Sequence, residues 1–233
     1  IITGLVGSEM CIRDRWEDAP SGMLECITVR SPNCRQIGFW HAYRDGADIL
    51  ITLDDDVRPT EGVIKQFTNI LSKGIPVWVD PMLNYRSRGY PKENLGSMDV
   101  DFHVGSFLGI PDVDGETQLQ YQSQFEEVPP QYISRPTIVP QGQFIPVNGG
   151  ICAWKRDLMP YIHFASWSSE LKYRRFDDIW MGVILKCLID HSGKRMSYGP
   201  PFVVHERASD PANNFELEKE GTIWNEVVWH RFI

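Results

Sequence analysis

The sequence lacks the features that identify several common classes of protein. Its five cysteines are odd in number and no two are spaced as CxxC, which argues against a disulfide framework or a zinc site and favours a reducing compartment. No apolar run reaches the length of a transmembrane helix, and no secretory signal is apparent. There is no GxGxxG pattern, so we predict no dinucleotide site. We therefore expect a cytoplasmic protein without a transmembrane segment.

Basic residues are scarce. The 233 residues include 23 Lys and Arg against 31 Asp and Glu, a net charge of −8. This balance argues against a nucleic-acid groove or an anionic membrane surface. An acidic protein that handles phosphates needs a metal ion or a few local arginines and lysines. With 42% hydrophobic residues, the chain is long enough to bury the core of one domain.

The first residues do not read as the start of a domain. Residues 1–15 do not begin with Met, and the string GSEMCIRDR resembles a translated sequencing adapter. We predict a non-native leader there, with a genuine leader as the alternative. Residues 16–233 are predicted to form a single domain that is incomplete at both ends, because the last residues follow an apolar pattern without a cap.

Three aspartates follow a short apolar strand. Ile49–Leu53 is too short for a helix and rich in β-branched residues, which predicts a buried strand, and Asp54, Asp55 and Asp56 come directly after it. Ligands bind at the carboxyl ends of strands in open α/β sheets. Adjacent carboxylates repel one another, and hard oxygen ligands suit Mg²⁺ or Mn²⁺ shared with substrate phosphates. The alternative is a solvated acidic turn.

The rest of the chain alternates predicted strands and helices, which indicates an α/β fold with a mainly parallel central sheet flanked by helices. A helix after Pro59, with Thr60 as its N-cap, precedes a strand at Ile75–Val79, and together with Ile49–Leu53 these predict a parallel βαβ unit. Residues 116–145 are predicted to be irregular. Further strands are predicted at 26–30, 102–108, 151–154 and 202–206, and further helices at 33–44 and from about 177 to 191.

Several candidate site residues lie at the ends of these elements. Asp177 and Asp178 open an apolar helix predicted to be buried, where they could serve as a general base or only complement the helix dipole. Gly149 and Gly150 precede a strand, where they admit a close ligand or form a β-bulge. His205 ends a strand, so we predict that it shares a cation with Asp54 and Asp56, a structural histidine being the alternative.

Two arginine positions are candidates for anion binding. Arg35, near the start of a helix, could approach a phosphate or pair with a surface carboxylate. Arg88 lies in a polar, aromatic loop, Asn84–Pro91, and loops at strand ends often carry function. Ordinary solvated charges are the alternative there.

Several short motifs follow one another along the chain. They are Cys34-Arg35, Asp54–Asp56, Arg88–Pro91, Ile110–Asp114 with Thr117–Leu119, Arg156–Leu158, Arg175–Trp180 with Gly182 and Lys186, and His205 with Ala208-Ser209. In this order they resemble the reversibly glycosylated polypeptide family, also called UDP-arabinopyranose mutases, from about Cys34 to Phe232. The resemblance implies a GT-A-like fold that here lacks the N-terminal nucleotide-binding strand, a UDP-sugar substrate, and Mn²⁺ or Mg²⁺ bound through the aspartates. It also implies glycosylation at Arg88, and attachment to Golgi membranes is an option in a eukaryote.

Three functions follow as hypotheses. The first is a metal-dependent mutase or glycosyltransferase that uses a UDP-sugar. The second is a non-catalytic subunit of a glycosyltransferase complex, assembled with homologues, because Leu95 replaces a second arginine of the family pattern. The third, a haloacid-dehalogenase-like phosphatase, is disfavoured because Arg58 stands where that chemistry needs Thr or Val.

Overall fold

The computed structural model describes residues 19–27, 31–54, 56–80, 82, 85–109, 111–127, 135–165, 175–205 and 210–232. The predicted leader, residues 1–15, and most of the predicted strand at 26–30 lie outside these ranges, as does Asp55. Cys26 and Ile27, the described part of the predicted strand, do not form a strand, so that prediction is wrong there. The short helix α2, Ser21–Glu25, ends in a turn at Cys26.

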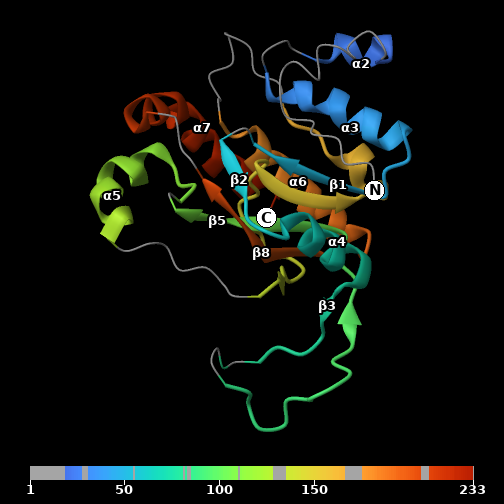
Figure 1. Ribbon diagram of the computed structural model, residues 1–233. Coiled ribbons are helices and arrows are strands. Elements are labelled where there is room, and N and C mark those ends of the chain that lie inside the picture. Colours follow the sequence, from blue (N-terminus) through green and yellow to red (C-terminus); the bar gives the residue numbers. More distant parts are fainter. Residues whose placement is uncertain are drawn as a thin grey trace.

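A central mixed sheet has the strand order β1-β7-β5-β8-β2, with β6 beside β8. Its most extensive pairing, β5 with β8, is parallel, whereas β1 with β7, β7 with β5, and β8 with β2 and β6 are antiparallel. Parallel character is therefore confined to the centre of the sheet (Figure 1). The strands are β1 Ile49–Leu53, β2 Val57–Pro59, β5 Phe102–Gly109, β6 Thr137–Ile138, β7 Ile151–Lys155 and β8 Met196–His205.

Helices cover both faces of this sheet. On one face, α3 (Arg35–Arg44), the 3-10 turn η3 (Arg156–Tyr161) and α6 (Asp177–His191) contribute to one core cluster. On the other face, α4 (Val63–Lys73) contributes to a second cluster. The predicted α/β class with flanking helices is confirmed, and the arrangement is compatible with a GT-A-like fold. Members of the two clusters include Phe39, Leu50, Trp154 and Leu185 in the first, and Phe67, Leu71, Ile151 and Val203 in the second.

The side chains of strand β1 point alternately to the two faces of the sheet. Leu50 belongs to the cluster under α3 and α6, whereas Ile51 and Leu53 pack against the cluster under α4. Since strand side chains alternate, Asp54, four residues after Leu50, is directed to the face that carries α3 and α6. This places the first aspartate between those two helices.

The predicted irregular segment contains a helix, so that prediction is wrong. Helix α5 spans Gly115–Glu127, and the Asp114 carboxylate accepts hydrogen bonds from the Thr117 N–H and hydroxyl, each at 2.8 Å. Such a carboxylate caps the first turn. The polar sequence of α5 shows little apolar periodicity, and its stability comes from packing against α7, Pro211–Phe232.

The predicted parallel βαβ unit does not form. Only Ile75–Pro76 is a strand (β3), and it pairs antiparallel with β4, Ser97–Met98, in a separate two-stranded sheet. Pro76 has no N–H to extend a ladder, which explains the early end of this strand. Thr60 is not the N-cap either: Gly62 holds that position at φ 78°, and the Thr60 hydroxyl donates to the Phe202 carbonyl of β8 at 2.7 Å.

Helix α6 is only partly buried, which corrects the expectation that it is covered all round. Ile184 and Leu188 are 47% and 42% exposed, although Leu185 and Ile189 are fully buried. Among the described residues, no helix is both long and apolar enough to cross a membrane.

Candidate functional site

The end of β1 lies beside the start of β7. The antiparallel register pairs Leu53 with Ile151, so the residue after β1 faces the residue before β7. The Asp54 N–H accordingly donates to the Gly150 carbonyl at 3.1 Å. The double glycine 149–150 thus becomes the point to which the surrounding elements converge.

Arg35 reaches this point from the start of α3. One guanidinium nitrogen lies 2.9 Å from an Asp54 carboxylate oxygen, and another donates to the Gly149 carbonyl at 3.3 Å. The guanidinium also lies over the Phe164 ring, 5.2 Å from its centre. Burial opposes the charge of Arg35, but Asp54, Asp177 and Asp178 together raise its pKa. Arg35 therefore stays a cation among carboxylates.

Asp177 and Asp178 reach the same point from the start of α6. One Asp178 carboxylate oxygen accepts the Gly149 N–H and the other accepts the Ile179 N–H, each at 2.9 Å. Burial, and then the neighbouring Asp177, raise the pKa of Asp178 to about 7. Burial also raises the pKa of Asp177 to about 6, although Arg35 partly opposes this. Together, the two carboxylates therefore bind or release a proton near neutral pH.

Gly149 and Gly150 are required by close packing. A Cβ on Gly150 would lie 2.5 Å from an Asp54 carboxylate oxygen, and one on Gly149 would lie 2.7 Å from the Phe164 ring. Both distances are shorter than real Cβ contacts. The absence of side chains at these positions is what lets Asp54, Arg35 and Asp178 meet.

Asn148 and Asp112 also belong to this cluster, although the sequence did not single them out. The Gly150 N–H donates to the Asn148 side-chain oxygen at 2.6 Å, and the Asn148 amide nitrogen donates to the Asp112 carboxylate. The charge of Asp112 contributes to the raised pKa of Asp178. An asparagine directly before a double glycine was the available signal. We call Arg35, Asp54, Asp112, Asn148, Asp177 and Asp178 the acidic cluster.

Helix α7 holds the start of α6 in place. The Glu218 carboxylate accepts a hydrogen bond from the Arg175 side chain at 2.7 Å and another from the Gly115 N–H at 2.6 Å. Arg175 adopts φ 66° two residues before the first residue of α6. The Trp180 indole N–H donates to Asn225 at 3.2 Å. These contacts tie the first turn of α6, and with it Asp177 and Asp178, to α5 and α7.

The predicted metal ligands form two separate contacts. Val57 pairs with His205 across β2 and β8, and the His205 imidazole nitrogen lies 3.5 Å from the Asp56 carboxylate. Asp54 is engaged with Arg35 instead. Within the described ranges, which omit Asp55, no three His, Cys, Asp or Glu side chains are gathered closely enough to hold a metal ion.

The structure does not bring Arg88 to the acidic cluster. Arg88 is exposed, in the segment between β3 and β4. Figure 1 shows the described parts of this segment extending below the sheet at the bottom of the view, whereas α6 and β1 lie in the body of the molecule above it.

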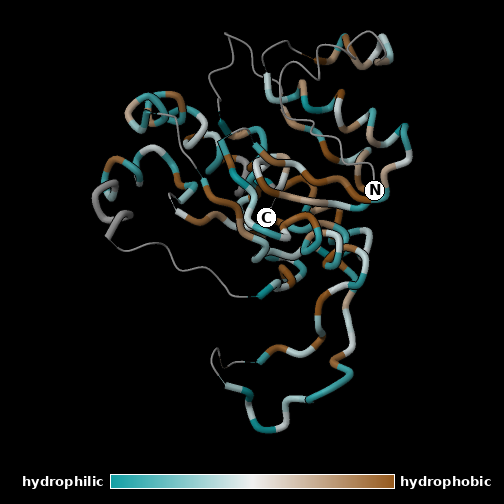
Figure 2. Tube along the Cα trace, viewed as in Figure 1, coloured by the Kyte–Doolittle hydropathy of each residue, from teal (hydrophilic) through white to brown (hydrophobic). Residues whose placement is uncertain are grey.

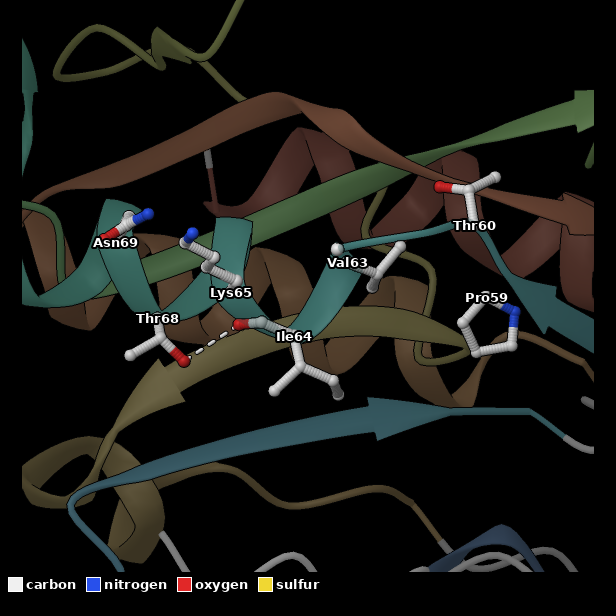
Figure 3. A pocket seen from close by; sticks show the side chains of 8 residues that line it. Pro59, Thr60, Val63, Ile64, Lys65, Thr68 and Asn69 are labelled. Carbon is white, nitrogen blue, oxygen red and sulfur yellow. Dashed lines mark hydrogen bonds between the residues drawn. The ribbon is translucent and has the colours of Figure 1, made fainter.

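A groove of about 410 Å³ lies beside the first turns of α4 (Figure 3). The Thr68 hydroxyl on its wall is bonded to the Ile64 carbonyl at 2.8 Å. The groove contains none of the predicted site residues and one charged side chain, so it offers little chemistry. Its lining residues are Pro59, Thr60, Gly62, Val63, Ile64, Lys65, Thr68 and Asn69.

The α/β domain, with an arginine and several carboxylates at the end of its first strand, is compatible with a GT-A-like fold. The chain belongs to the reversibly glycosylated polypeptide family, which it matches over residues 11–232.

Three relatives illustrate this membership. The chain is 28% identical to UDP-arabinopyranose mutase 3 of Arabidopsis thaliana over 214 residues, which are 86% of this chain and 58% of that protein. It is 27% identical to UDP-arabinopyranose mutase 1 of Oryza sativa subsp. japonica over 215 residues, which are 87% of this chain and 58% of that protein. It is also 27% identical to the probable UDP-arabinopyranose mutase 1 of Zea mays over 215 residues, again 87% of this chain and 58% of that protein. The chain thus spans less than two thirds of the length of these relatives.

Proposed function

We propose that the full-length protein is a UDP-sugar-utilising mutase or glycosyltransferase resembling the UDP-arabinopyranose mutases. The observation that carries this proposal is the convergence of Arg35, Asp54 and Asp178 on Gly149-Gly150, in a chain that belongs to this family. Relatives named UDP-arabinopyranose mutase, at 26–28% identity, support the same substrate class.

Arg35 would bind the diphosphate. Its side chain is 33% exposed, and its guanidinium is held by Asp54 and the Gly149 carbonyl. A planar guanidinium can contact two phosphate oxygens at once. A diphosphate would therefore compete with Asp54 for Arg35, so the ion pair is an interaction that the ligand replaces. The backbone of Gly149 and Gly150 would let the ligand approach the strand end closely.

Asp177 and Asp178 would handle the protons of the sugar. Because burial brings the pKa of Asp178 to about 7, the pair can both donate and accept a proton at neutral pH, which suits general acid–base catalysis. Asp178 is also fixed by two backbone N–H groups. We expect one carboxylate to orient a sugar hydroxyl while the other takes or returns its proton.

A divalent cation, Mn²⁺ or Mg²⁺, remains part of the proposal. Asp54 and Asp56 would hold it, with Asp55 contributing to nucleotide binding and His205 adjoining Asp56. Two carboxylates are a sufficient protein contribution when substrate phosphates complete the coordination. When bound, such an ion would neutralise charge on the departing diphosphate.

Arg88 stays part of the proposal through the family resemblance alone, since the structure does not bring it to the acidic cluster; it would act electrostatically on the diphosphate or the departing sugar. The family resemblance makes it the glycosylated residue, but a guanidinium stays protonated at neutral pH and is a poor nucleophile. We therefore assign any covalent adduct a secondary role.

Calorimetry with the full-length protein tests this function. We expect UDP to bind in a manner that depends on Mn²⁺, and Asp178→Asn to lose turnover of the UDP-sugar. Asp157→Asn is the matched control, because Asp157 pairs with Lys194 on the surface, away from the cluster. Absence of UDP binding with and without Mn²⁺ would exclude the proposal.

A non-catalytic subunit is the second candidate. Leu95, half-buried in the segment between β3 and β4, stands where the family pattern has a second arginine. On this view the protein assembles with an active homologue. UDP binding without sugar transfer by the isolated protein, together with co-purification of a homologue that restores transfer, would favour it over the first.

A further inference from the structure

One face of α6 runs alongside residues 139–150, the segment between β6 and β7; we call it the connecting segment. On a helix, residues four apart in sequence lie one above the other on the same face. The connecting segment contacts such a row at three levels, from the end of the helix to its start. The residues of this row are Asp178, Gly182, Lys186 and Asp190.

Lys186 and Asp190 hold the first part of the connecting segment. Lys186 is only 1% exposed, and its ammonium donates to the Pro140 carbonyl at 3.0 Å and to both oxygens of the Asp190 carboxylate. The Asp190 carboxylate also accepts the Gly142 N–H at 2.9 Å. The ammonium lies 5.8 Å from the centre of the Phe144 ring. The ion pair therefore binds the backbone of the connecting segment at two points.

The surroundings of this ion pair are apolar. Figure 2 shows hydrophobic stretches through the body of the molecule, where Figure 1 labels β1 and α6. The neighbouring residues Leu185 and Ile189 are fully buried. An ion pair removed from water is weak evidence for stability, because apolar residues of similar volume often serve as well. The role of Lys186 is therefore to be sought in the position of the segment that it holds.

The other two levels carry this alignment to the acidic cluster. Gly182 is packed so closely that an added Cβ would lie 2.4 Å from the Val147 Cβ. Two residues further along the segment, the Gly149 N–H donates to the Asp178 carboxylate at 2.9 Å. A slip of the segment by one residue would move Gly149 by roughly 3.5 Å. Such a slip would break the hydrogen bond to Asp178.

We propose that Lys186 is a positioning residue of the candidate site. Through the connecting segment it sets the place of the Gly149 N–H, and this N–H in turn fixes the Asp178 carboxylate. Lys186 lies eight residues from Asp178 on the same helix, roughly 12 Å, so it acts through the segment and not on the substrate. The placement of the N–H rests on the contacts above, whereas its consequence for turnover rests on the proposed function.

A double variant separates positioning from stability. Lys186→Met leaves Asp190 without its cation, so we expect the Tm of the full-length protein to fall by more than about 5 °C. Lys186→Met combined with Asp190→Leu replaces both partners by apolar side chains, so we expect the Tm to return close to that of the wild type. If the ion pair only stabilised the fold, this double variant would also match the wild type at Gly149. If Lys186 positions the segment, the double variant is stable but altered there.

Nuclear magnetic resonance reads the Gly149 N–H directly. Asn precedes Gly once in the 233 residues, at Asn148-Gly149, so ¹³C-carbonyl Asn and ¹⁵N-Gly labels select this amide. Asn148→Gln identifies its signal in the full-length protein. We expect the double variant to shift the amide proton upfield and to speed its exchange with solvent by about tenfold or more, because the bond to a carboxylate is lost. An unchanged signal in a stable double variant would overturn the proposal.

Lys194→Met is the matched control. Lys194 also pairs with a carboxylate, that of Asp157, but it lies beyond the end of α6, so the Gly149 signal should not move. Gly182→Ala decides the question if the double variant does not fold. Its Cβ should displace Val147 and shift the Gly149 signal, whereas Gly22→Ala, with nothing within 4 Å of its Cβ, should not. In that case an unmoved signal in Gly182→Ala would overturn the proposal.

Turnover separates this proposal from the proposed function. With a UDP-sugar as substrate, we expect kcat of the double variant to fall by about ten- to a hundredfold and KM to stay within about threefold, because Arg35 keeps its ion pair with Asp54. Wild-type kcat with a displaced Gly149 signal would leave the proposed function standing and overturn the role of Lys186. A wild-type protein that binds no UDP would end the proposed function, and the Gly149 signal would still decide whether Lys186 positions that N–H.

Discussion

A guanidinium nitrogen of Arg35 lies 2.9 Å from an Asp54 carboxylate oxygen, which joins the start of α3 to the end of β1. About a third of each side chain is exposed. Ion pairs of such exposure contribute only about 0–1 kcal/mol to stability. The pair therefore serves less to hold the fold than to keep a cation beside the strand end, where a diphosphate would need it.

Arg35→Lys tests this view. The lysine keeps the charge but loses the planar fork, so we expect UDP affinity to fall by about tenfold while stability changes little. Arg44→Lys is a suitable comparison, because Arg44 lies on the same helix, pairs with Asp45 at 2.9 Å and also lies over an aromatic ring. Calorimetry and thermal unfolding measure the two effects. Equal affinity losses in both variants would show that Arg35 has no special role.

Gly150→Ala tests the close packing beneath the cluster. The added Cβ would lie 2.5 Å from the Asp54 carboxylate, so Asp54 must move or the strand end must shift. We expect a loss of about 1–3 kcal/mol in the free energy of unfolding, together with weaker UDP binding. Gly22→Ala has nothing within 4 Å of the new Cβ and should change neither. A fully stable Gly150→Ala protein would indicate that this turn is looser than the distances imply.

Asp178→Asn tests the raised pKa through the pH dependence of stability. The folded-state pKa of about 7 lies above the ordinary value, so the folded state retains a proton that the unfolded state has lost. The resulting cost is present in full above about pH 7 and shrinks as the pH falls toward about 4.

We therefore expect the wild-type protein to gain about 1–3 kcal/mol between about pH 8 and about pH 5 relative to Asp178→Asn, with Asp177 sharing the titration. Denaturant unfolding at several pH values measures this difference. Asp157→Asn should follow the wild-type curve. Parallel curves for wild type and Asp178→Asn would mean that Asp178 is ionised throughout.

The fold could be predicted from the sequence where local pattern and tertiary context agree. The bounds of β1 were predictable because an apolar, β-branched run ends abruptly at Asp54. Helix α6 was predictable because Gly193, at φ 69°, follows its last residue, His191, closely. Helix α5 was missed because its sequence is polar and its partner, α7, lies far along the chain.

The candidate site also contains residues that the sequence could identify and contacts that it could not. Asp54 and Asp178 were identifiable because each stands at the end of a strongly apolar element. The contact between Asp112 and Asn148 joins residues 36 positions apart and depends on the path of the chain between them, which no local pattern encodes. The direction of the segment between β3 and β4 was equally unpredictable, since a polar loop with arginines does not reveal where it extends.

Substitutions at the aspartates test the cation. Asp54→Ala and Asp56→Ala should each abolish Mn²⁺-dependent UDP binding, because both are predicted to hold the same ion. Asp55→Ala should be milder if strand alternation continues. His205→Ala should weaken Mn²⁺ binding without unfolding the domain, since its imidazole adjoins Asp56 at 3.5 Å. Calorimetric titration of Mn²⁺ in the presence of UDP measures each loss. Unchanged Mn²⁺ affinity in His205→Ala would assign that residue to structure alone.

Arg88 gives the last prediction. It is exposed at the second position of a turn, so replacing it should leave the free energy of unfolding within about 0.5 kcal/mol of wild type. Arg88→Lys keeps the charge but loses the planar fork, and we expect it to bind UDP-sugar moderately and turn over poorly. Arg88→Ala should lose both binding and turnover. Arg86→Lys is the matched control in the same segment between β3 and β4, because Arg86 lies over the Tyr90 ring. If Arg88→Ala and Arg86→Lys both kept wild-type turnover, neither the electrostatic nor the covalent role of Arg88 would stand.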